Sequence, residues 1–315
     1  MAKRKITAMI TLLILLMTIL LIDGCRRRED DSDTETAEVT TETTGTSDTS
    51  DTSGTFEKSY GVFIGVDEYS FHIEDFDGYD LVIIDAQELR EEQLRQLHAS
   101  GHTVYSYLNV GSLEKSRDYY QDLKHLCLDR YDNWPDEYWV NVTDDLWAEV
   151  AGKILPAMIK EHDPDIDGLF LDNLDVYAHL QEEKKYESIA KNAYDSLAAI
   201  LEAYRDQGLP VIVNGADEFV TRLIDENRQD LIRGVNQETV FTRIINYNRD
   251  WFGAAGKEQK QFYTAYLERC SGAGLDVFLV EYTKDEKLAK EIRDYCTENG
   301  YRFYISEHVN LNPSE

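Results

Sequence analysis

Short apolar runs alternate with helix-like stretches along most of this chain, and this rhythm limits the fold more than any other feature. Eight runs fit a strand, and an acidic residue stands at or soon after the end of each. Short strands that alternate with amphipathic helices form a parallel sheet, and eight such units in about 250 residues close into a barrel. The strands are predicted at residues 60–67, 81–87, 103–111, 168–173, 210–215, 233–238, 276–282 and 302–307. The sequence therefore predicts an α/β fold with a single (β/α)8 TIM barrel.

Helical patterns fill the gaps between these runs. They cover residues 88–99, 182–207, 217–230, 258–271 and 284–299. The alternative is an open, doubly wound parallel sheet. That fold usually has a glycine-rich phosphate loop after its first strand, and the sequence GVFIGVDEYS at that point contains no GxGxxG. The barrel is the favoured interpretation.

The chain is strongly acidic. It has 61 Asp and Glu against 32 Lys and Arg, which gives a formal net charge of -29. Such a charge repels the phosphate backbone of nucleic acids and favours neutral or cationic ligands. Nucleic acid is therefore excluded as a partner.

The N-terminus has the pattern of a bacterial export signal. Basic residues at 3–5 precede an uncharged run at 6–22, and the sequence IDGC at 22–25 resembles a lipobox whose Cys25 is acylated. Asp23 is unusual in such a motif, and a single uncleaved membrane anchor is the alternative. We expect residues 1–25 to be a lipoprotein signal peptide that ends at the lipobox cysteine, and the mature protein to be extracytoplasmic and lipid-anchored to the bacterial cell membrane.

The segment after the lipobox cannot build a core. Residues 29–55 are Thr, Ser, Asp, Glu and Gly apart from Ala37 and Val39, and they contain no Lys or Arg. Low hydrophobicity with like charges predicts an extended, disordered tether. We place this tether at residues 26–58 and the folded barrel domain at residues 59–315.

Three cysteines remain for the folded part. Cys270 and Cys296 fall in consecutive predicted helices, so a disulfide between them is conceivable outside the cytoplasm. That pairing would leave Cys127 unpaired, and buried free thiols are the favoured interpretation. The chain has no CxxC or Cys/His metal spacing, so neither a metal nor another cofactor is expected.

A long aromatic and polar stretch at residues 112–147 interrupts the rhythm after the third predicted strand. Loops after strands build the active site of a barrel, and exposed rings offer flat faces on which sugars stack. The stretch is expected to lie over the barrel mouth, although its rings could instead only pack the loop. These rings belong to Tyr119, Tyr120, Tyr131, Trp134, Tyr138 and Trp139.

Strand parity selects among the acids at the strand ends. Alternate residues of a strand share a face, so Gly168, Phe170 and Asp172 point the same way, which we take to be the barrel axis. The same count places Glu238, Glu281 and Glu307 on the axis. Acids also begin helices well, and Asp85, Glu114 and Asp217 precede helical stretches, so we interpret these three as caps.

Three short motifs carry a resemblance to a known family. FLDNLD in the fourth strand, YLNVGS in the third and VNQE in the sixth resemble glycoside hydrolase family 114, barrel enzymes typified by endo-α-1,4-polygalactosaminidase. The resemblance covers about residues 60–311 and implies that Asp172 and Glu238 are the catalytic acid pair. Asp175 and Asn109 match further motif positions. The chain departs from the family at Ser112, where many relatives have an acid.

The resemblance implies a reaction that suits two acids. One carboxylic acid protonates the leaving oxygen, and one carboxylate attacks the anomeric carbon or activates water. We expect Asp172 to be the nucleophile or stabiliser and Glu238 the general acid, with retention favoured by analogy to other sugar-cleaving barrels. The substrate expected from the resemblance is α-1,4-linked galactosamine polysaccharide, which is cationic and suits an acidic mouth. The candidate substrate-binding residues are Asp67, Tyr107, Asn109, Asp175, Asn214, Glu281 and Glu307.

Three other interpretations stay open. A non-catalytic carbohydrate-binding lipoprotein would keep the aromatic loop without the geometry of the acid pair. A polysaccharide deacetylase would need a metal-binding His and Asp set, and the seven histidines form no such cluster. Asp172, Asp175 and His179 could be read as metal ligands, but a hard cation needs more oxygen ligands than this set supplies.

Overall fold

The computed structural model describes residues 59–132 and 134–313. The predicted signal peptide and tether lie outside these residues. Eight parallel strands form one sheet in the order β1-β2-β3-β7-β8-β9-β12-β13, and β1 lies near β13, so the sheet forms a nearly closed barrel. The predicted (β/α)8 barrel is confirmed. The strands are β1 (Tyr60–Val62), β2 (Leu81–Ile84), β3 (Thr103–Asn109), β7 (Gly168–Asp172), β8 (Val211–Asn214), β9 (Gly234–Glu238), β12 (Asp276–Tyr282) and β13 (Arg302–Ser306).

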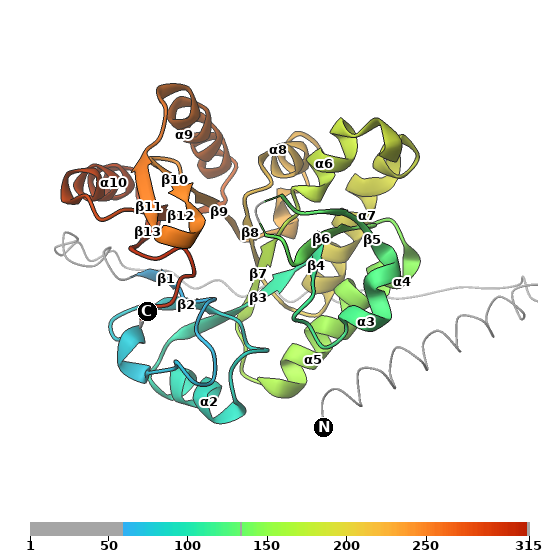
Figure 1. Ribbon diagram of the computed structural model, residues 1–315, viewed down its shortest axis with the longest axis horizontal. Coiled ribbons are helices and arrows are strands. Elements are labelled where there is room, and N and C mark those ends of the chain that lie inside the picture. The colour runs from blue at the N-terminus through green and yellow to red at the C-terminus, as the bar shows by residue number, and fades with distance from the viewer. Residues whose placement is uncertain (1–58, 133, 314–315) are drawn as a thin grey trace, which may run out of the picture.

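Helices surround the barrel and connect successive strands (Figure 1). A short 3-10 helix, Ile73–Phe76, stands in place of the first helix. The longest helix, α7, shows why these segments are helical, because Ala193, Leu197 and Leu201 recur at helical spacing and form a buried stripe. The α-helices that precede the later barrel strands are α2 (Glu91–Ala99), α5 (Leu155–His162), α6 (Val176–Glu182), α7 (Glu187–Asp206), α8 (Asp217–Asp225), α9 (Lys257–Gly272) and α10 (Glu286–Asn299).

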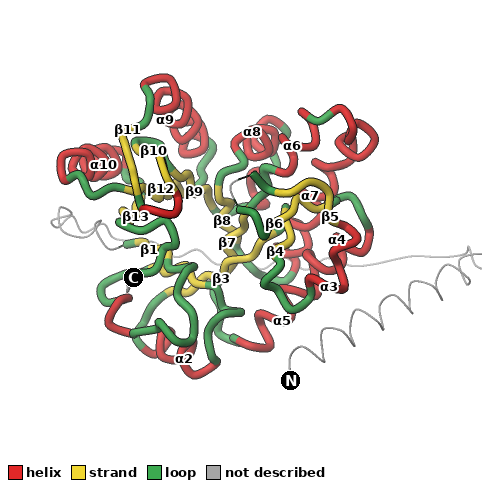
Figure 2. Tube along the Cα trace, in the orientation of Figure 1, coloured by secondary structure: helices red, strands yellow, loops and turns green. Residues whose placement is uncertain are grey.

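Two small antiparallel sheets interrupt the barrel pattern, as the tube drawing shows (Figure 2). The first, which we call the small sheet, follows β3 and has the order β4 (Ser112–Glu114), β6 (Glu137–Val140), β5 (Cys127–Arg130). A short helix, α3 (Tyr120–Leu123), lies between β4 and β5 along the chain, and another, α4 (Asp145–Glu149), follows β6. The second, which we call the hairpin, follows β9 and pairs β10 (Thr242–Asn246) with β11 (Trp251–Ala254). Both insertions come after strands, where a barrel builds its site.

The barrel interior is filled by large side chains. Gly168 pairs with Tyr105, and a Cβ at Gly168 would lie 2.4 Å from Cζ of the Tyr105 ring, so glycine is what lets this ring enter the interior. Above it, the rings of Tyr60 and Phe278 meet with their centroids 4.8 Å apart. The interior is therefore a packed core that supports the carboxyl ends of the strands.

The register of β12 with its two neighbours corrects two parity predictions. Phe278 pairs with Asn236 and Val280 with Glu238, and paired residues of parallel strands point to the same side. Glu281 therefore points away from the axis, and Tyr282 takes the place that was predicted for it. A shift of one residue exchanges the two faces of a strand. The prediction was wrong because it assumed that the acid at position 281 marks the face toward the axis. Glu281 also pairs with Ile305 of β13, which places Glu307 on the same outer side.

Cys270 and Cys296 are buried free thiols, and Cys127 is a partly exposed free thiol. The favoured interpretation of the cysteines agrees with this arrangement. Within residues 59–132 and 134–313, no helix is both long enough and apolar enough to cross a membrane.

Candidate active site

A pocket of about 470 Å³ opens at the carboxyl ends of the barrel strands. Strands β7, β8, β9 and β12 each contribute their last residue, and the small sheet and the hairpin contribute the outer wall. Charged, amide and aromatic side chains line much of this pocket. They include Asp85, Tyr107, Glu114, Arg117, Tyr131, Trp134, Glu137, Asp172, Asp175, Asn214, Glu238, Tyr247 and Tyr282.

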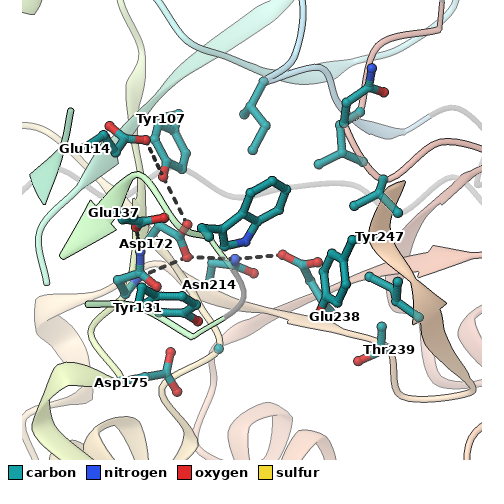
Figure 3. A pocket seen from close by; sticks show the side chains of 18 of the residues that line it. Tyr107, Glu114, Tyr131, Glu137, Asp172, Asp175, Asn214, Glu238, Thr239 and Tyr247 are labelled. Atoms are coloured by element: carbon teal, nitrogen blue, oxygen red, sulfur yellow. Dashed lines mark hydrogen bonds between the residues drawn. The ribbon is translucent and has the colours of Figure 1, made fainter. Parts of the chain in front are cut away.

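Two carboxylates face each other across one amide in this pocket (Figure 3). Asn214 ends β8, between the strands that carry Asp172 and Glu238. Its Nδ2 donates to Oδ1 of Asp172 at 3.0 Å and to Oε1 of Glu238 at 2.9 Å. Because one nitrogen touches both groups, these two oxygens lie no more than about 6 Å apart, below the spacing typical of inverting glycosidases.

A tyrosine hydroxyl holds the second oxygen of each carboxylate. Tyr107 donates to Oδ2 of Asp172 at 3.1 Å, and Tyr282 donates to Oε2 of Glu238 at 2.7 Å. Burial first, and the neighbouring carboxylates second, raise the pKa of both tyrosines well above the ordinary value, so both hydroxyls stay protonated donors. The backbone N–H of Asn173 adds a further bond to Oδ1 of Asp172 at 2.9 Å. Asp172 thus accepts three hydrogen bonds.

The chain turns sharply just after each of these side chains. Asn173 follows Asp172 with a φ of 61°, and Thr239 follows Glu238 with a φ of 56°. Gly215, after Asn214, also has a positive φ of 65°. A left-handed conformation costs a non-glycine residue about 1 kcal/mol or more, and most for a β-branched one such as Thr239. Such strain at the strand exits is typical of functional sites.

The pocket holds more negative charge than its cation can balance. Arg117 is the one basic residue among the described residues that line it, and it pairs with Asp85 at 2.7 Å and with Glu114. The acids without such a partner are Glu137, Asp172, Asp175 and Glu238. Burial, followed by repulsion from Glu238, raises the pKa of Asp172 to about 6. Burial and the charge of Asp172 raise the pKa of Asp175 to about 7.

Glu137 ties the small sheet to the barrel beside the acid pair. Its Oε1 accepts from Nδ2 of Asn109 at 2.7 Å, from Nδ2 of Asn173 at 2.5 Å and from the Ser112 hydroxyl. Burial is the main reason that its pKa rises to about 7. Asn109, predicted to bind substrate, is buried below the pocket surface and supports Glu137. Ser112, where the chain departs from the family pattern, has the same partner.

Three other predicted substrate-binding residues do line the pocket. Tyr107 and Asn214 contact the acid pair directly, as described above. Asp175 lies below Tyr131 in Figure 3, and its Oδ1 accepts from the backbone N–H of Ala216 at 3.0 Å. These residues surround the space that a substrate would enter.

Glu281 has a different environment from the one predicted. It is fully buried and accepts from the backbone N–H groups of Phe241 and Thr242, at 2.9 and 3.0 Å, and from the Thr242 hydroxyl at 2.5 Å. Burial raises its pKa to about 7. Its side chain anchors the base of the hairpin, so it cannot contact a substrate in the pocket.

Asp67 and Glu307 also lie away from the pocket, contrary to the prediction. Asp67 accepts from the backbone N–H groups of Tyr69 and Ser70 in its own turn, at 3.0 and 2.8 Å. Glu307 is exposed and lines a separate groove beside the start of α10. Local turn formation explains Asp67, and the outward parity of β13 explains Glu307.

Sequence reasoning missed part of the pocket wall. Asp85 and Glu114 were interpreted as caps, but both bind Arg117, and helix α2 begins only at Glu91. Glu137 and Tyr282 were not singled out. The signals that could have found them are weak, because Glu137 begins a short strand of the small sheet that was not predicted, and Tyr282 can be assigned to the pocket only if the register of β12 is known.

The metal interpretation finds no support in the geometry. Among residues 59–132 and 134–313, no group of three or more His, Cys, Asp or Glu side chains is placed to hold an ion. His179 instead stacks on Trp139 and lies 3.5 Å from the Asp129 carboxylate.

A wider groove of about 1210 Å³ continues from the pocket between the small sheet and the hairpin. Glu114, Glu137 and Tyr247 border both spaces. At the border, Trp134 meets Tyr247 edge to face with ring centroids 5.8 Å apart. Both rings are partly exposed, so aromatic faces are available where the pocket opens. The combined space is larger than one sugar ring needs.

Comparison with known proteins adds a family and a fold. The family model described as glycoside-hydrolase family GH114 matches residues 46–311. No curated protein matches the sequence significantly.

Two solved structures are similar over most of the chain. The glycoside hydrolase domain of PelA from Pseudomonas aeruginosa is 17% identical, with a TM-score of 0.66 over 81% of this chain and 96% of that one. Ega3 from Aspergillus fumigatus, solved in complex with galactosamine, is 15% identical, with a TM-score of 0.62 over 85% of this chain and 98% of that one. At these identities the likeness establishes the shared barrel fold.

Proposed function

The chain belongs to glycoside-hydrolase family GH114 and is an O-glycoside hydrolase, and from this premise we propose that it cleaves an α-1,4-linked galactosamine-containing polysaccharide with two carboxylates and net retention. The observation that carries the proposal is the single amide of Asn214, which contacts both Asp172 and Glu238. Carboxyl groups this close leave no room for a water between a base and the sugar, but they suit a nucleophile and an acid.

The proposed reaction has two steps. Asp172 attacks the anomeric carbon and forms a glycosyl ester while the bond to the leaving oxygen breaks, and Glu238 gives that oxygen a proton. Glu238 then takes a proton from water, which attacks the same carbon and releases Asp172. Three donors stabilise the Asp172 carboxylate, and a pKa of about 6 leaves it mostly ionised at neutral pH.

The charge and shape of the site support a cationic polymer as the substrate. Four acids of the pocket lack a basic partner among the lining residues, and free amines of a galactosamine polymer would compensate them. The adjoining groove offers room for further sugars, and Trp134 and Tyr247 offer ring faces for sugar C–H surfaces. Galactosamine is also the ligand named for the Ega3 complex.

We also propose that the enzyme works outside the cytoplasm. The lipobox-like sequence at residues 22–25 would attach Cys25 to lipid, and the acidic segment 26–58 would hold the barrel away from the membrane. The partners are then the polysaccharide and the lipid surface.

Release of new reducing ends tests the proposed activity. Full-length wild type, Asp172→Asn and Glu238→Gln are incubated with partly deacetylated α-1,4-galactosamine polymer. We expect product from the wild type and a loss of at least about 10²-fold in each variant, since each removes a group that acts in the transition state. Glu307→Gln, which removes an exposed acid outside the pocket, is the matched control and should keep wild-type activity.

The same assay also examines the binding-protein alternative. A wild type that releases nothing from this polymer or from neutral glycans, yet binds one of them, would contradict hydrolysis and favour a carbohydrate-binding lipoprotein.

A further inference from the structure

We propose that Asn214 is a positioning residue that holds the two catalytic carboxyl groups at their working separation, and that Asn236 and Tyr60 fix the orientation of its amide from inside the barrel. This inference rests on the proposed function, because it assigns the roles of nucleophile and acid to Asp172 and Glu238. It replaces the earlier prediction that Asn214 binds substrate.

A chain of hydrogen bonds runs from the barrel core to the acid pair. Tyr60, on β1, donates its hydroxyl to Oδ1 of Asn236 at 3.1 Å. Asn236, on β9, donates from Nδ2 to Oδ1 of Asn214 at 2.6 Å. Tyr60 and Asn236 are both fully buried. The chain thus links three strands of the barrel beneath the site.

Each link has a fixed donor and acceptor. The Tyr60 hydroxyl is a donor, and burial raises its pKa well above the ordinary value. It turns the carbonyl of Asn236 toward itself, which leaves the NH₂ of Asn236 facing the carbonyl of Asn214. The NH₂ of Asn214 then faces the two carboxylates. A reversed Asn214 amide would place its oxygen against two carboxylates and its NH₂ against the NH₂ of Asn236, and so would break all three hydrogen bonds of this side chain.

The arrangement leaves Asn214 no N–H to offer a sugar. An amide nitrogen has two hydrogens, and the bonds to Asp172 and Glu238 use both of them. Its oxygen faces the buried Asn236 and accepts from it. The side chain therefore acts through the two carboxylates and not on the substrate.

Substitution of Asn214 by leucine separates positioning from substrate binding. The full-length Asn214→Leu protein is compared with wild type by ¹³C NMR titration of the Asp172 carboxyl without substrate, and by kinetics on the galactosamine polymer. We expect the midpoint of Asp172 to rise, because the variant removes a donor that favours the charged form. We also expect kcat to fall about tenfold to a hundredfold with KM nearly unchanged. A higher KM with an unchanged Asp172 midpoint would overturn the proposal.

Substitution of Tyr60 tests the deeper part of the chain. Tyr60→Phe removes only the hydroxyl that orients Asn236, and Tyr204→Phe is its matched control. Tyr204 is equally buried, and its hydroxyl donates to the backbone oxygen of Ala151 at 2.8 Å, away from the pocket. Both variants should lose similar thermal stability. Only Tyr60→Phe should lower kcat, by about threefold to tenfold, and raise the Asp172 midpoint.

The two readouts keep this inference distinct from the proposed function. If Tyr60→Phe behaves like Tyr204→Phe in both readouts, the orienting role of Tyr60 and Asn236 is wrong. If the wild type does not cleave the polymer, the proposed substrate is wrong, and the substrate-free titration of Asp172 still decides whether Asn214 positions the pair.

Discussion

Asp172 combines burial, a neighbouring acid and three hydrogen-bond donors, and their balance sets its protonation. Burial and Glu238 raise its pKa to about 6, while Asn214, Asn173 and Tyr107 oppose that rise. The nucleophile must be ionised, so kcat/KM should fall as the pH drops below about 6. The plot of kcat/KM against pH on the galactosamine polymer measures this fall, which is the acidic limb of the pH profile, directly.

Tyr107→Phe should move that limb to higher pH. The variant removes one donor to the Asp172 carboxylate, and a lost hydrogen bond to a charged group corresponds to about one pH unit. A limb that stays in place, or moves to lower pH, would show that another group controls it.

At the residue scale, the sequence contained enough information for the acid pair but not for its surroundings. Asp172 and Glu238 end strands that are obvious from their apolar runs, and family motifs mark the same positions. Glu281 was assigned to the pocket because the register of β12 cannot be derived from alternation alone. Glu137 was missed because it reaches the pocket through a tertiary contact with Asn109 and Asn173.

At the scale of elements, Glu281 makes the hairpin depend on one buried carboxylate. Glu281→Gln replaces an acceptor oxygen with an NH₂ group that faces backbone or hydroxyl donors at Phe241 and Thr242. We expect it to lose about 1 to 3 kcal/mol of unfolding free energy in denaturant titrations. KM should rise too, because the hairpin carries Tyr247 to the pocket.

Glu307→Gln is the control for that variant. It removes an acid of the same type from an exposed position on the neighbouring strand end, and it should change neither stability nor KM. Equal behaviour of the two variants would contradict the anchoring role of Glu281.

The small sheet and the hairpin were not predicted as elements. Their strands are short, irregular in alternation and held by contacts with the barrel, so local propensity does not determine them. The aromatic loop was predicted to lie at the mouth, and Tyr131 and Trp134 do line the pocket. Tyr119 and Trp139 instead pack the loop, so both interpretations of the rings apply to different residues.

At the scale of the whole molecule, the barrel could be predicted because each strand–helix unit has a recognisable pattern in its own stretch of sequence. Each buried strand and amphipathic helix has its own pattern, and closure of eight units follows from their number. The exact strand ends shifted by a few residues, as with β1, which stops at Val62 where the apolar run continues.

Stability should depend on pH in a direction set by the buried acids. The pKa of Asp172 is raised to about 6, and that of Glu137, Asp175 and Glu281 to about 7, while unfolded acids titrate near 4. The stability that these groups contribute is complete below the unfolded pKa and is lost as the pH rises through about 7.

The melting temperature of the full-length chain should therefore be higher at pH 5.5 than at pH 7.5. Acids whose pKa is lowered, such as Asp67 and Asp136, lose their contribution only at more acidic pH and do not oppose this trend. A lower melting temperature at pH 5.5, measured by calorimetry at constant ionic strength, would contradict the protonation states assigned to the pocket.

Chemical rescue by azide tests the central claim most directly, namely that Asp172 and Glu238 flank one glycosidic bond as nucleophile and acid. Asp172→Ala and Glu238→Ala are each given the galactosamine polymer with azide, and the anomeric configuration of any glycosyl azide is determined by NMR. The account predicts a β-azide from Asp172→Ala, where azide replaces the nucleophile, and an α-azide from Glu238→Ala, where azide attacks the glycosyl ester. The exchanged pattern, or no azide product from either active-site variant, would contradict it.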